Sequence, residues 1–225
     1  MTISRIQIYG ERCSGTNYIE SLIKLNYDIE ISYSYGWKHW IIDYSNLKMN
    51  ESTLFLVVVR NPYDQLRSLY YQPHHAPHHY KLPMNEFLRK KWLSYDGPTA
   101  HWFSDDENER FAIAKPEYII EEEENVCILR NKKNKNFIDL EKHVENYVLI
   151  NYEDLLFDYT QIGNLDKFGL RKKLPTFVPV ESYKGDHNEK YTTKDYPILS
   201  LEDILFINKS LDWELENFLG YQMSF

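Results

Sequence analysis

The segment from Ile6 to Asn17 has the residue types of a phosphate-binding loop. A short apolar stretch leads to Gly10, a second glycine follows at Gly15, and apolar residues at helical spacing begin directly afterwards. Backbone amides at the start of a helix carry partial positive charge and bind phosphate oxygens. The pattern that binds nucleoside triphosphates continues with Lys and then Ser or Thr, whereas this chain has Thr16 and Asn17. We therefore expect a phosphate cradle that serves chemistry other than nucleotide hydrolysis.

Side chains in this loop and in a second segment can add contacts to an anion. Arg12 offers a bidentate guanidinium and Ser14 offers a hydroxyl. Arg60 follows the apolar run 54–59, and Ser68 lies eight residues later on the next predicted helix. Ligands of open α/β sheets bind at the ends of such inner strands. The two segments together predict a site that holds an anion from two sides.

These two segments resemble the sulfotransferase family, whose members use the sulfate donor 3′-phosphoadenosine 5′-phosphosulfate (PAPS). In that family a loop of the type basic residue-Ser-Gly-Thr-Thr holds the 5′-phosphosulfate, and Cys13-Ser14-Gly15-Thr16-Asn17 is similar to it. A second family motif holds the 3′-phosphate, and Arg60-Asn61-Pro62, Asp64 and Ser68 match it. The resemblance implies that the first loop, Arg60 and Ser68 bind PAPS.

The resemblance continues in later parts of the chain. Tyr152-Glu153-Asp154-Leu155 is similar to a stretch that follows a late strand in the family, and Leu219-Gly220-Tyr221 is similar to its C-terminal pattern. A basic-basic-Gly segment of the family contacts the 3′-phosphate, and Lys184-Gly185 is a partial counterpart. Residues 84–145 show hardly any similarity.

One departure concerns the basic residue of the first loop. Its place falls on Cys13, and Arg12 stands one position early. A one-residue bulge would return the guanidinium to the site, where it would stabilise charge on the leaving phosphate. The exact role of Arg12 is therefore open at this stage.

The segment Gly36–Trp40 contains the candidate general base. In many sulfotransferases a histidine at a strand end takes the acceptor proton, and His39 lies 21 residues before Arg60. Histidine suits proton transfer near neutral pH. Lys38 would stabilise charge on the bridging oxygen. Other family members use a carboxylate base, so Glu11 is the alternative.

The segment Gln72–His79 contains four histidines within six positions. They form adjacent pairs rather than the i, i+4 pair of helical metal ligands, and no cysteine is near in sequence. Sulfuryl transfer from PAPS needs no metal. We interpret the segment as a mobile loop lining an acceptor cleft rather than as a metal site.

Alternation of strand and helix patterns over the first 160 residues predicts an α/β fold with a central parallel sheet. The predicted strands are 5–9, 29–35, 54–59 and 148–152; the predicted helices begin near residue 16, at 62–71, around 84–93 and at 211–219, with a capping box at Ser200 and Asp203. The acidic run 121–124 and the basic run 132–135 are interpreted as solvated faces. No linker or repeat divides residues 1–225, so we expect a single domain. The resemblance implies a three-layer α/β/α P-loop fold.

Composition narrows the function classes. A formal net charge of −8 argues against general nucleic-acid binding, which needs a basic face. Two cysteines in 225 residues do not make a disulfide framework, and no apolar run is long enough to span a membrane. The N-terminus shows no secretory signal segment. We expect a cytoplasmic protein.

The resulting hypothesis is transfer of a sulfuryl group from PAPS to a hydroxyl or amine of a saccharide, a protein tyrosine, a lipid or a small molecule. His39, Lys38 and Arg12 would carry the chemistry. The alternatives are a P-loop kinase or NTPase, which needs a lysine at Thr16 and a magnesium ligand, and a non-catalytic nucleotide-binding domain of the same fold.

Overall fold

The computed structural model describes residues 2–97, 101–112, 114–181, 196 and 198–225. The chain divides into two compact units, which we call the sheet unit (Met1–Asn61 and Lys133–Asp195) and the second unit (Pro62–Lys132 and Tyr196–Phe225). Lys184 and Gly185, the partial counterpart of a 3′-phosphate segment, lie outside the described residues.

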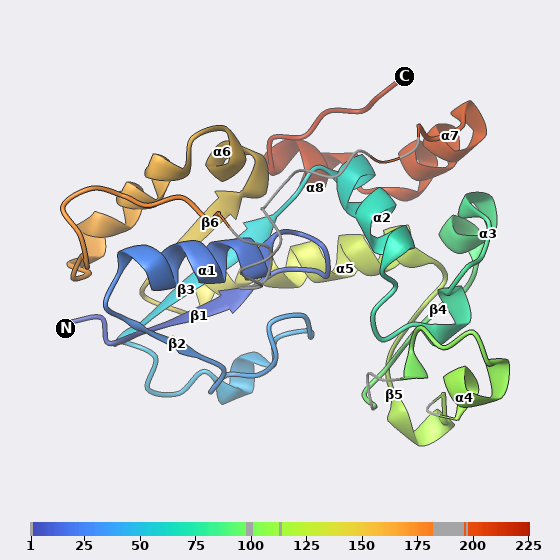
Figure 1. The fold of residues 1–225 in the computed structure, drawn as a ribbon, viewed down its shortest axis with the longest axis horizontal. Coiled ribbons are helices and arrows are strands. Elements are labelled where there is room, and N and C mark those ends of the chain that lie inside the picture. Colours follow the sequence, from blue (N-terminus) through green and yellow to red (C-terminus); the bar gives the residue numbers. More distant parts are fainter. Residues whose placement is uncertain (1, 98–100, 113, 182–195, 197) are drawn as a thin grey trace. The chain divides into compact units, whose positions relative to one another are not determined.

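Within the described residues the sheet unit holds a four-stranded parallel sheet with the order β2-β1-β3-β6 (Figure 1). Its strands are β1 (Arg5–Tyr9), β2 (Glu30–Ser32), β3 (Thr53–Val59) and β6 (Tyr147–Asn151). Its helical segments are α1 (Thr16–Asn26), the last residues of α5 (Val126–Asp139), α6 (Tyr152–Phe157) and the 3₁₀ segments η1 (Tyr44–Asn46), η5 (Leu140–Lys142) and η6 (Tyr159–Phe168). Every residue of β3 is buried, as its continuous apolar run predicts for an inner parallel strand.

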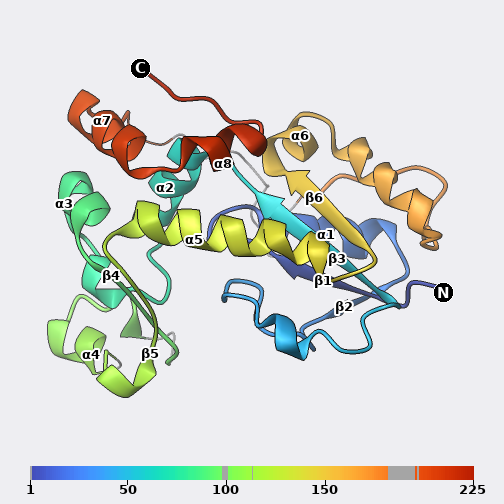
Figure 2. The ribbon, with the colours of Figure 1, turned by 180° about the vertical axis from the view of Figure 1, so that it is seen from behind.

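Helices cover both faces of this sheet, which confirms the α/β class. Strand side chains alternate between faces, so Ile6 and Ile8 of β1 pack with the apolar side chains of α1 and α6. On the opposite face Tyr9 stacks with Phe55 of β3 and with Phe137 of α5, at ring-centroid distances of 6.5 and 6.1 Å. Figure 2 shows the end of α5 crossing that second face.

The strand order creates a topological switch point between β1 and β3. After β1 the chain passes through α1 to β2, which pairs with one edge of β1. The next strand, β3, pairs with the other edge of β1. The Gly10 loop therefore follows the carboxyl end of β1, and Arg60 follows that of β3. Ligands of open parallel sheets bind at such a switch point.

The second unit is built from short elements and contains an antiparallel pair of strands. Its elements are α2 (Pro62–Tyr71), α3 (Met84–Arg89), β4 (Trp92–Tyr95), α4 (Glu107–Phe111), β5 (Ile119–Glu123), the first part of α5, α7 (Leu201–Ser210) and α8 (Trp213–Phe218). The Ser200 hydroxyl caps α7 by accepting from the Asp203 amide at 3.1 Å, which confirms the predicted capping box. No helix in the described ranges is long and apolar enough to cross a membrane.

Three local predictions need correction. The predicted strand 29–35 shortens to β2 because the chain turns near Ser34 and Gly36, which has φ 110°. The predicted helix 84–93 ends at Arg89, since buried Trp92 begins β4 and its indole N–H donates to Ser94 Oγ at 2.9 Å. The acidic run 121–124 is not a solvated face throughout, because strand alternation buries Glu121.

Candidate anion-binding site

The loop between β1 and α1 requires its two glycines. A Cβ on Gly10 would lie 2.6 Å from the carbonyl oxygen of Val58 and 2.9 Å from Thr16 Cγ2. A Cβ on Gly15 would lie 2.2 Å from Cδ2 of the Tyr152 ring, and Gly15 has φ 95°. The sequence pattern thus corresponds to a loop pressed against β3 and α6, with no room for side chains at either position.

The loop is a tight turn that leads into an eleven-residue helix. The Ser14 amide and hydroxyl both donate to the Glu11 carbonyl, at 3.1 and 2.7 Å, and Cys13 has φ 65°. Gly15 is the N-cap of α1 and offers no side chain to accept the first helical amides. Such amides are suited to an anion, in line with the sequence prediction.

Four cationic side chains contact this loop, and they come from four different segments of the sheet unit: Arg12, Lys38, Arg60 and Lys133. Glu11 pairs with Arg12 and Lys133, and Glu20 pairs with Lys38, while Glu153 accepts from the Asn61 amide beside Arg60. The helix N-terminus adds partial positive charge to these four cations. A cluster of cations at this loop is compatible with an anionic ligand despite the negative total charge of the chain.

Lys38 supplies an ammonium beside the position that anchors magnesium in nucleotide-hydrolysing loops. Its Nζ donates to Asn17 Oδ1 at 2.5 Å and lies 3.3 Å from Glu20 Oε2. Lys38 is buried, and its carbonyl accepts from the Gly10 amide at 3.0 Å. A lysine from the segment after β2 thus brings an ammonium to the first turn of α1.

Arg60 contacts the backbone of the loop. Its Nη1 donates to the Cys13 carbonyl at 3.0 Å, and its guanidinium lies 5.1 Å from the centroid of the Tyr152 ring. The Glu153 carboxylate accepts from the Asn61 amide at 2.8 Å. The Tyr152-Glu153 pair therefore joins the first loop to the end of β3.

Glu11 and Arg12 are both buried and bonded to each other. Glu11 Oε1 accepts from the Arg12 amide at 2.7 Å and from Arg12 Nη1 at 3.1 Å, while the guanidinium lies 5.0 Å from the centroid of a Trp40 ring. Glu11 Oε2 lies 2.7 Å from Lys133 Nζ. Glu11 is thus held by two cations, which makes it a poor candidate for the general base.

Lys133 corrects the prediction that the run 132–135 is a solvated face. Its side chain is fully buried, whereas its neighbour Lys132 is exposed and pairs with Glu123. Helical geometry turns consecutive residues by about 100°, so one lysine of the run points into the sheet unit while the next points away. A run of charged residues does not indicate which of its members is buried, and the sequence analysis missed Lys133 for that reason.

His39 lies in the turn region that follows β2, not at a strand end. Its Nδ1 is 2.8 Å from the Gly10 carbonyl, which can only accept, so Nδ1 carries the proton and Nε2 holds the lone pair. Burial first, and then the Arg12 guanidinium, hold the pKa of His39 well below its usual range, with Lys38 and Lys133 acting in the same direction. The imidazole is therefore neutral at neutral pH.

Ser68 lies on α2 in the second unit, so it is not among the residues that the sheet unit brings together. Its hydroxyl accepts from Tyr196 at 2.8 Å, and the Arg67 side chain donates to the Tyr196 carbonyl at 3.3 Å.

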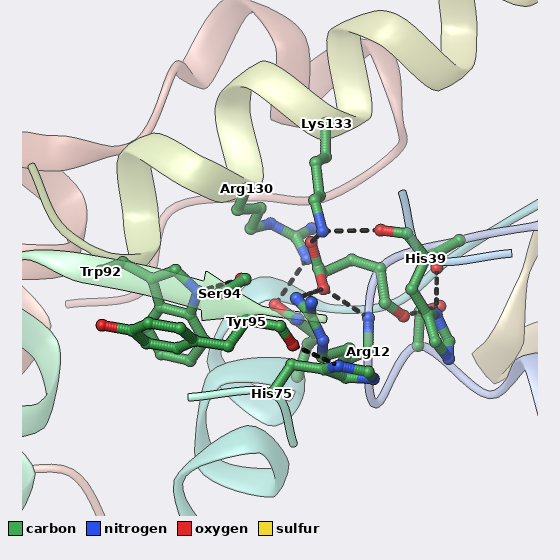
Figure 3. Close-up of polar contacts among 12 residues, drawn as sticks. Arg12, His39, His75, Trp92, Ser94, Tyr95, Arg130 and Lys133 are labelled. Atoms are coloured by element: carbon green, nitrogen blue, oxygen red, sulfur yellow. Dashed lines mark hydrogen bonds and ion pairs between the residues drawn. The ribbon is translucent and has the colours of Figure 1, made fainter. Parts of the chain in front are cut away.

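The histidines of the 72–79 segment pack on aromatic side chains of the second unit. His75 Nδ1 donates to the Tyr95 carbonyl at 2.9 Å (Figure 3), and buried His79 lies 4.4 Å from the Trp92 ring centroid. In the described part of the chain no three His, Cys, Asp or Glu side chains gather as metal ligands. These contacts give the segment a packing role.

Acid should destabilise the protein through His79. Burial lowers the pKa of His79 to about 4, so the unfolded chain binds this proton at higher pH than the folded one. The neutral His79 side chain makes its full contribution to the free energy of unfolding above pH 6.5. This contribution, about 3 kcal/mol in total, is lost as the pH falls towards 4. Urea denaturation between pH 7 and 4 should show a shallower decline for His79→Leu, while the exposed-site variant His143→Gln should decline as the wild type does. Parallel curves for all three proteins would contradict this assignment.

Comparisons with protein-family models, with curated proteins and with solved structures found no match to this chain.

Proposed function

We propose that this protein transfers a sulfuryl group from PAPS to a hydroxyl or amine acceptor. One observation carries the proposal: at the loop between β1 and α1, a lysine ammonium contacts the residue whose counterpart anchors magnesium in nucleotide-hydrolysing loops. Asn17 stands at the metal-anchoring position and already accepts from the Lys38 ammonium. A fixed ammonium at that point opposes a second cation and suits a donor whose transfer needs none.

The remaining groups fit the donor. The amides that begin α1 after Gly15 suit the 5′-phosphosulfate, and Arg60 at the end of β3 suits the 3′-phosphate. Lys38, with the amides that begin α1, would stabilise the charge that builds on the leaving phosphate. Preorganised groups of this kind act without reorganisation during the reaction. We also propose that the fold is the three-layer α/β/α P-loop fold of sulfotransferases.

His39 is the proposed base. The acceptor proton passes to its Nε2 lone pair while the acceptor oxygen or nitrogen forms a bond to sulfur. The bond between sulfur and the bridging phosphate oxygen breaks, and adenosine 3′,5′-bisphosphate leaves with that electron pair. The negative charges of the donor raise the basicity of a histidine that three cations otherwise suppress.

The experiment that tests this function is a ligand comparison followed by transfer. Adenosine 3′,5′-bisphosphate at a hundredfold over its Kd should stabilise the protein by about 2.7 kcal/mol, a Tm rise of roughly 5–10 °C. ATP and 5′-AMP should give smaller shifts. Sulfur-35 from labelled PAPS should then reach one member of a panel of saccharides, tyrosine peptides and phenols. A shift with ATP alone would favour the kinase or NTPase alternative and overturn the proposal.

Arg60→Ala should abolish most of the Tm rise caused by the bisphosphate, because it removes the guanidinium at the carboxyl end of β3. Arg5→Ala is the matched control, since Arg5 is also a half-buried arginine but begins β1 at the opposite end of the sheet. Differential scanning fluorimetry with increasing bisphosphate measures both. Retention of the full shift in Arg60→Ala, or equal loss in the two variants, would contradict the assigned site.

A further inference from the structure

Lys133 is a buried cation that the proposed reaction leaves without a task. Its Nζ lies 2.7 Å from Glu11 Oε2 and donates to the His39 carbonyl at 2.7 Å. It also lies 5.8 Å from the centroid of a Trp40 ring. Figure 3 shows its side chain extending from α5 to the backbone of the segment that carries His39.

These contacts close a ring around the candidate base. Lys133 joins the His39 backbone to Glu11, and Glu11 belongs to the phosphate loop. The loop accepts from the His39 ring through the Gly10 carbonyl, and the Gly10 amide donates to the carbonyl of Lys38. His39 is therefore held twice: its ring by the loop and its backbone by Lys133.

Packing alone does not call for a lysine at this position. Uncharged side chains of similar volume at both Lys133 and Glu11 would fill the space without taking two charges out of water, and buried ion pairs replaced in this way are often neutral or stabilising. The feature that an apolar side chain lacks is the hydrogen bond that fixes the His39 backbone, together with a positive charge near the imidazole.

We propose that Lys133 is a positioning residue, which with Glu11 fixes the His39 imidazole against the phosphate loop in its Nδ1–H form. This inference rests on the proposed function for its catalytic meaning but not for its geometry. The charged groups that act on His39 are Arg12 of the loop, Lys38 of its own segment and Lys133 of α5, and the carboxylates paired with two of them are Glu20 on Lys38 and Glu11 on Lys133. Lys133 is the member of this group that lies farthest from the others in sequence.

Lys133→Met is the primary test, with Lys132→Met as the matched control on the same helix, because Lys132 is exposed and pairs only at the surface. Glu11→Gln combined with Lys133→Met removes both charges and so leaves no unpaired carboxylate if the single variant fails to fold. Nitrogen-15 NMR of labelled histidine, assigned with His39→Gln, reports the tautomer and titration of His39 without any substrate.

We expect wild type and Lys132→Met to show the Nδ1–H tautomer of His39 and a low pKa. In Lys133→Met the tautomers should mix and the pKa of His39 should rise, because a repelling charge is gone. In the double variant, which removes one charge of each sign, the mixing of tautomers is the expected result. With labelled PAPS, kcat should fall about a hundredfold, as expected for a displaced base, while bisphosphate affinity changes little.

Unchanged tautomer and titration in folded Lys133 variants would overturn the positioning role, and so would failure of both variants to fold, which would make the pair purely structural. If the wild type transfers no sulfate, the proposed function fails, yet the NMR comparison still decides whether Lys133 positions His39. If the wild type transfers sulfate and the Lys133 variants keep its kcat, only the positioning role fails.

Discussion

His39→Gln is expected to lower kcat for sulfuryl transfer about 10²- to 10⁴-fold, the usual contribution of a positioned general base. Glutamine keeps a similar length and can still donate to the Gly10 carbonyl, but it has no lone pair of comparable basicity. Binding of adenosine 3′,5′-bisphosphate should persist, because Arg60 and the cradle remain. Single-turnover rates with labelled PAPS and fluorimetry with the bisphosphate measure the two effects.

The pH dependence separates His39 from an ordinary histidine. The base acts in its neutral form, and burial with the Arg12 charge holds the pKa of His39 well below 6.5 in the free protein. The kcat/KM profile reports the free protein, so it should stay level as pH falls from 8 through 6.5 and decline only below that range. His143→Gln, a change at an exposed histidine that stacks on Tyr44, should reproduce the wild-type profile.

Two outcomes would contradict His39 as the base. One is normal kcat in His39→Gln, which would return attention to Glu11. The other is an acid limb centred on 6.5, which would require a titrating group in a less buried setting. Because Glu11 is held by Arg12 and Lys133, Glu11→Gln should act mainly through stability instead.

The second large effect is expected from Gly15→Ala. Left-handed backbone costs an alanine about 1–2 kcal/mol, and the new Cβ would lie 2.2 Å from Tyr152 Cδ2, for which overpacking adds about 1–3 kcal/mol. We expect a total loss of about 2–5 kcal/mol in the free energy of unfolding and a weaker response to the bisphosphate. Urea denaturation at pH 7 measures the first and fluorimetry the second.

Gly169→Ala is the matched control for backbone strain. Gly169 also has a positive φ, of 71°, but a Cβ there meets nothing within 4 Å. It should therefore lose only the backbone contribution of about 1–2 kcal/mol and keep the full bisphosphate response. Equal losses in the two variants would show that the close approach of Tyr152 to the loop carries no energetic weight.

Much of the sheet unit could be predicted from local sequence. The run 54–59 lies within β3, the residues after Gly15 form α1, and Pro62 begins α2 as its preference for the first helical turn predicts. Prediction failed where packing decided the conformation. Residues 84–93 have helical spacing throughout, yet the buried indole of Trp92 draws its part of the segment into a strand.

The sequence by itself determined the cradle, because the spacing of Gly10 and Gly15 between a strand and a helix is a local property of the backbone. It also determined that Arg60 follows an inner strand. Only the tertiary structure decided which charges meet at the cradle. Lys38 contacts Asn17 at the start of α1, and Lys133 reaches the loop from a helix more than a hundred residues away in sequence. The physical reason is that burial and pairing of a charge depend on which face of which element packs against the loop, and the order of residues along the chain does not encode that directly.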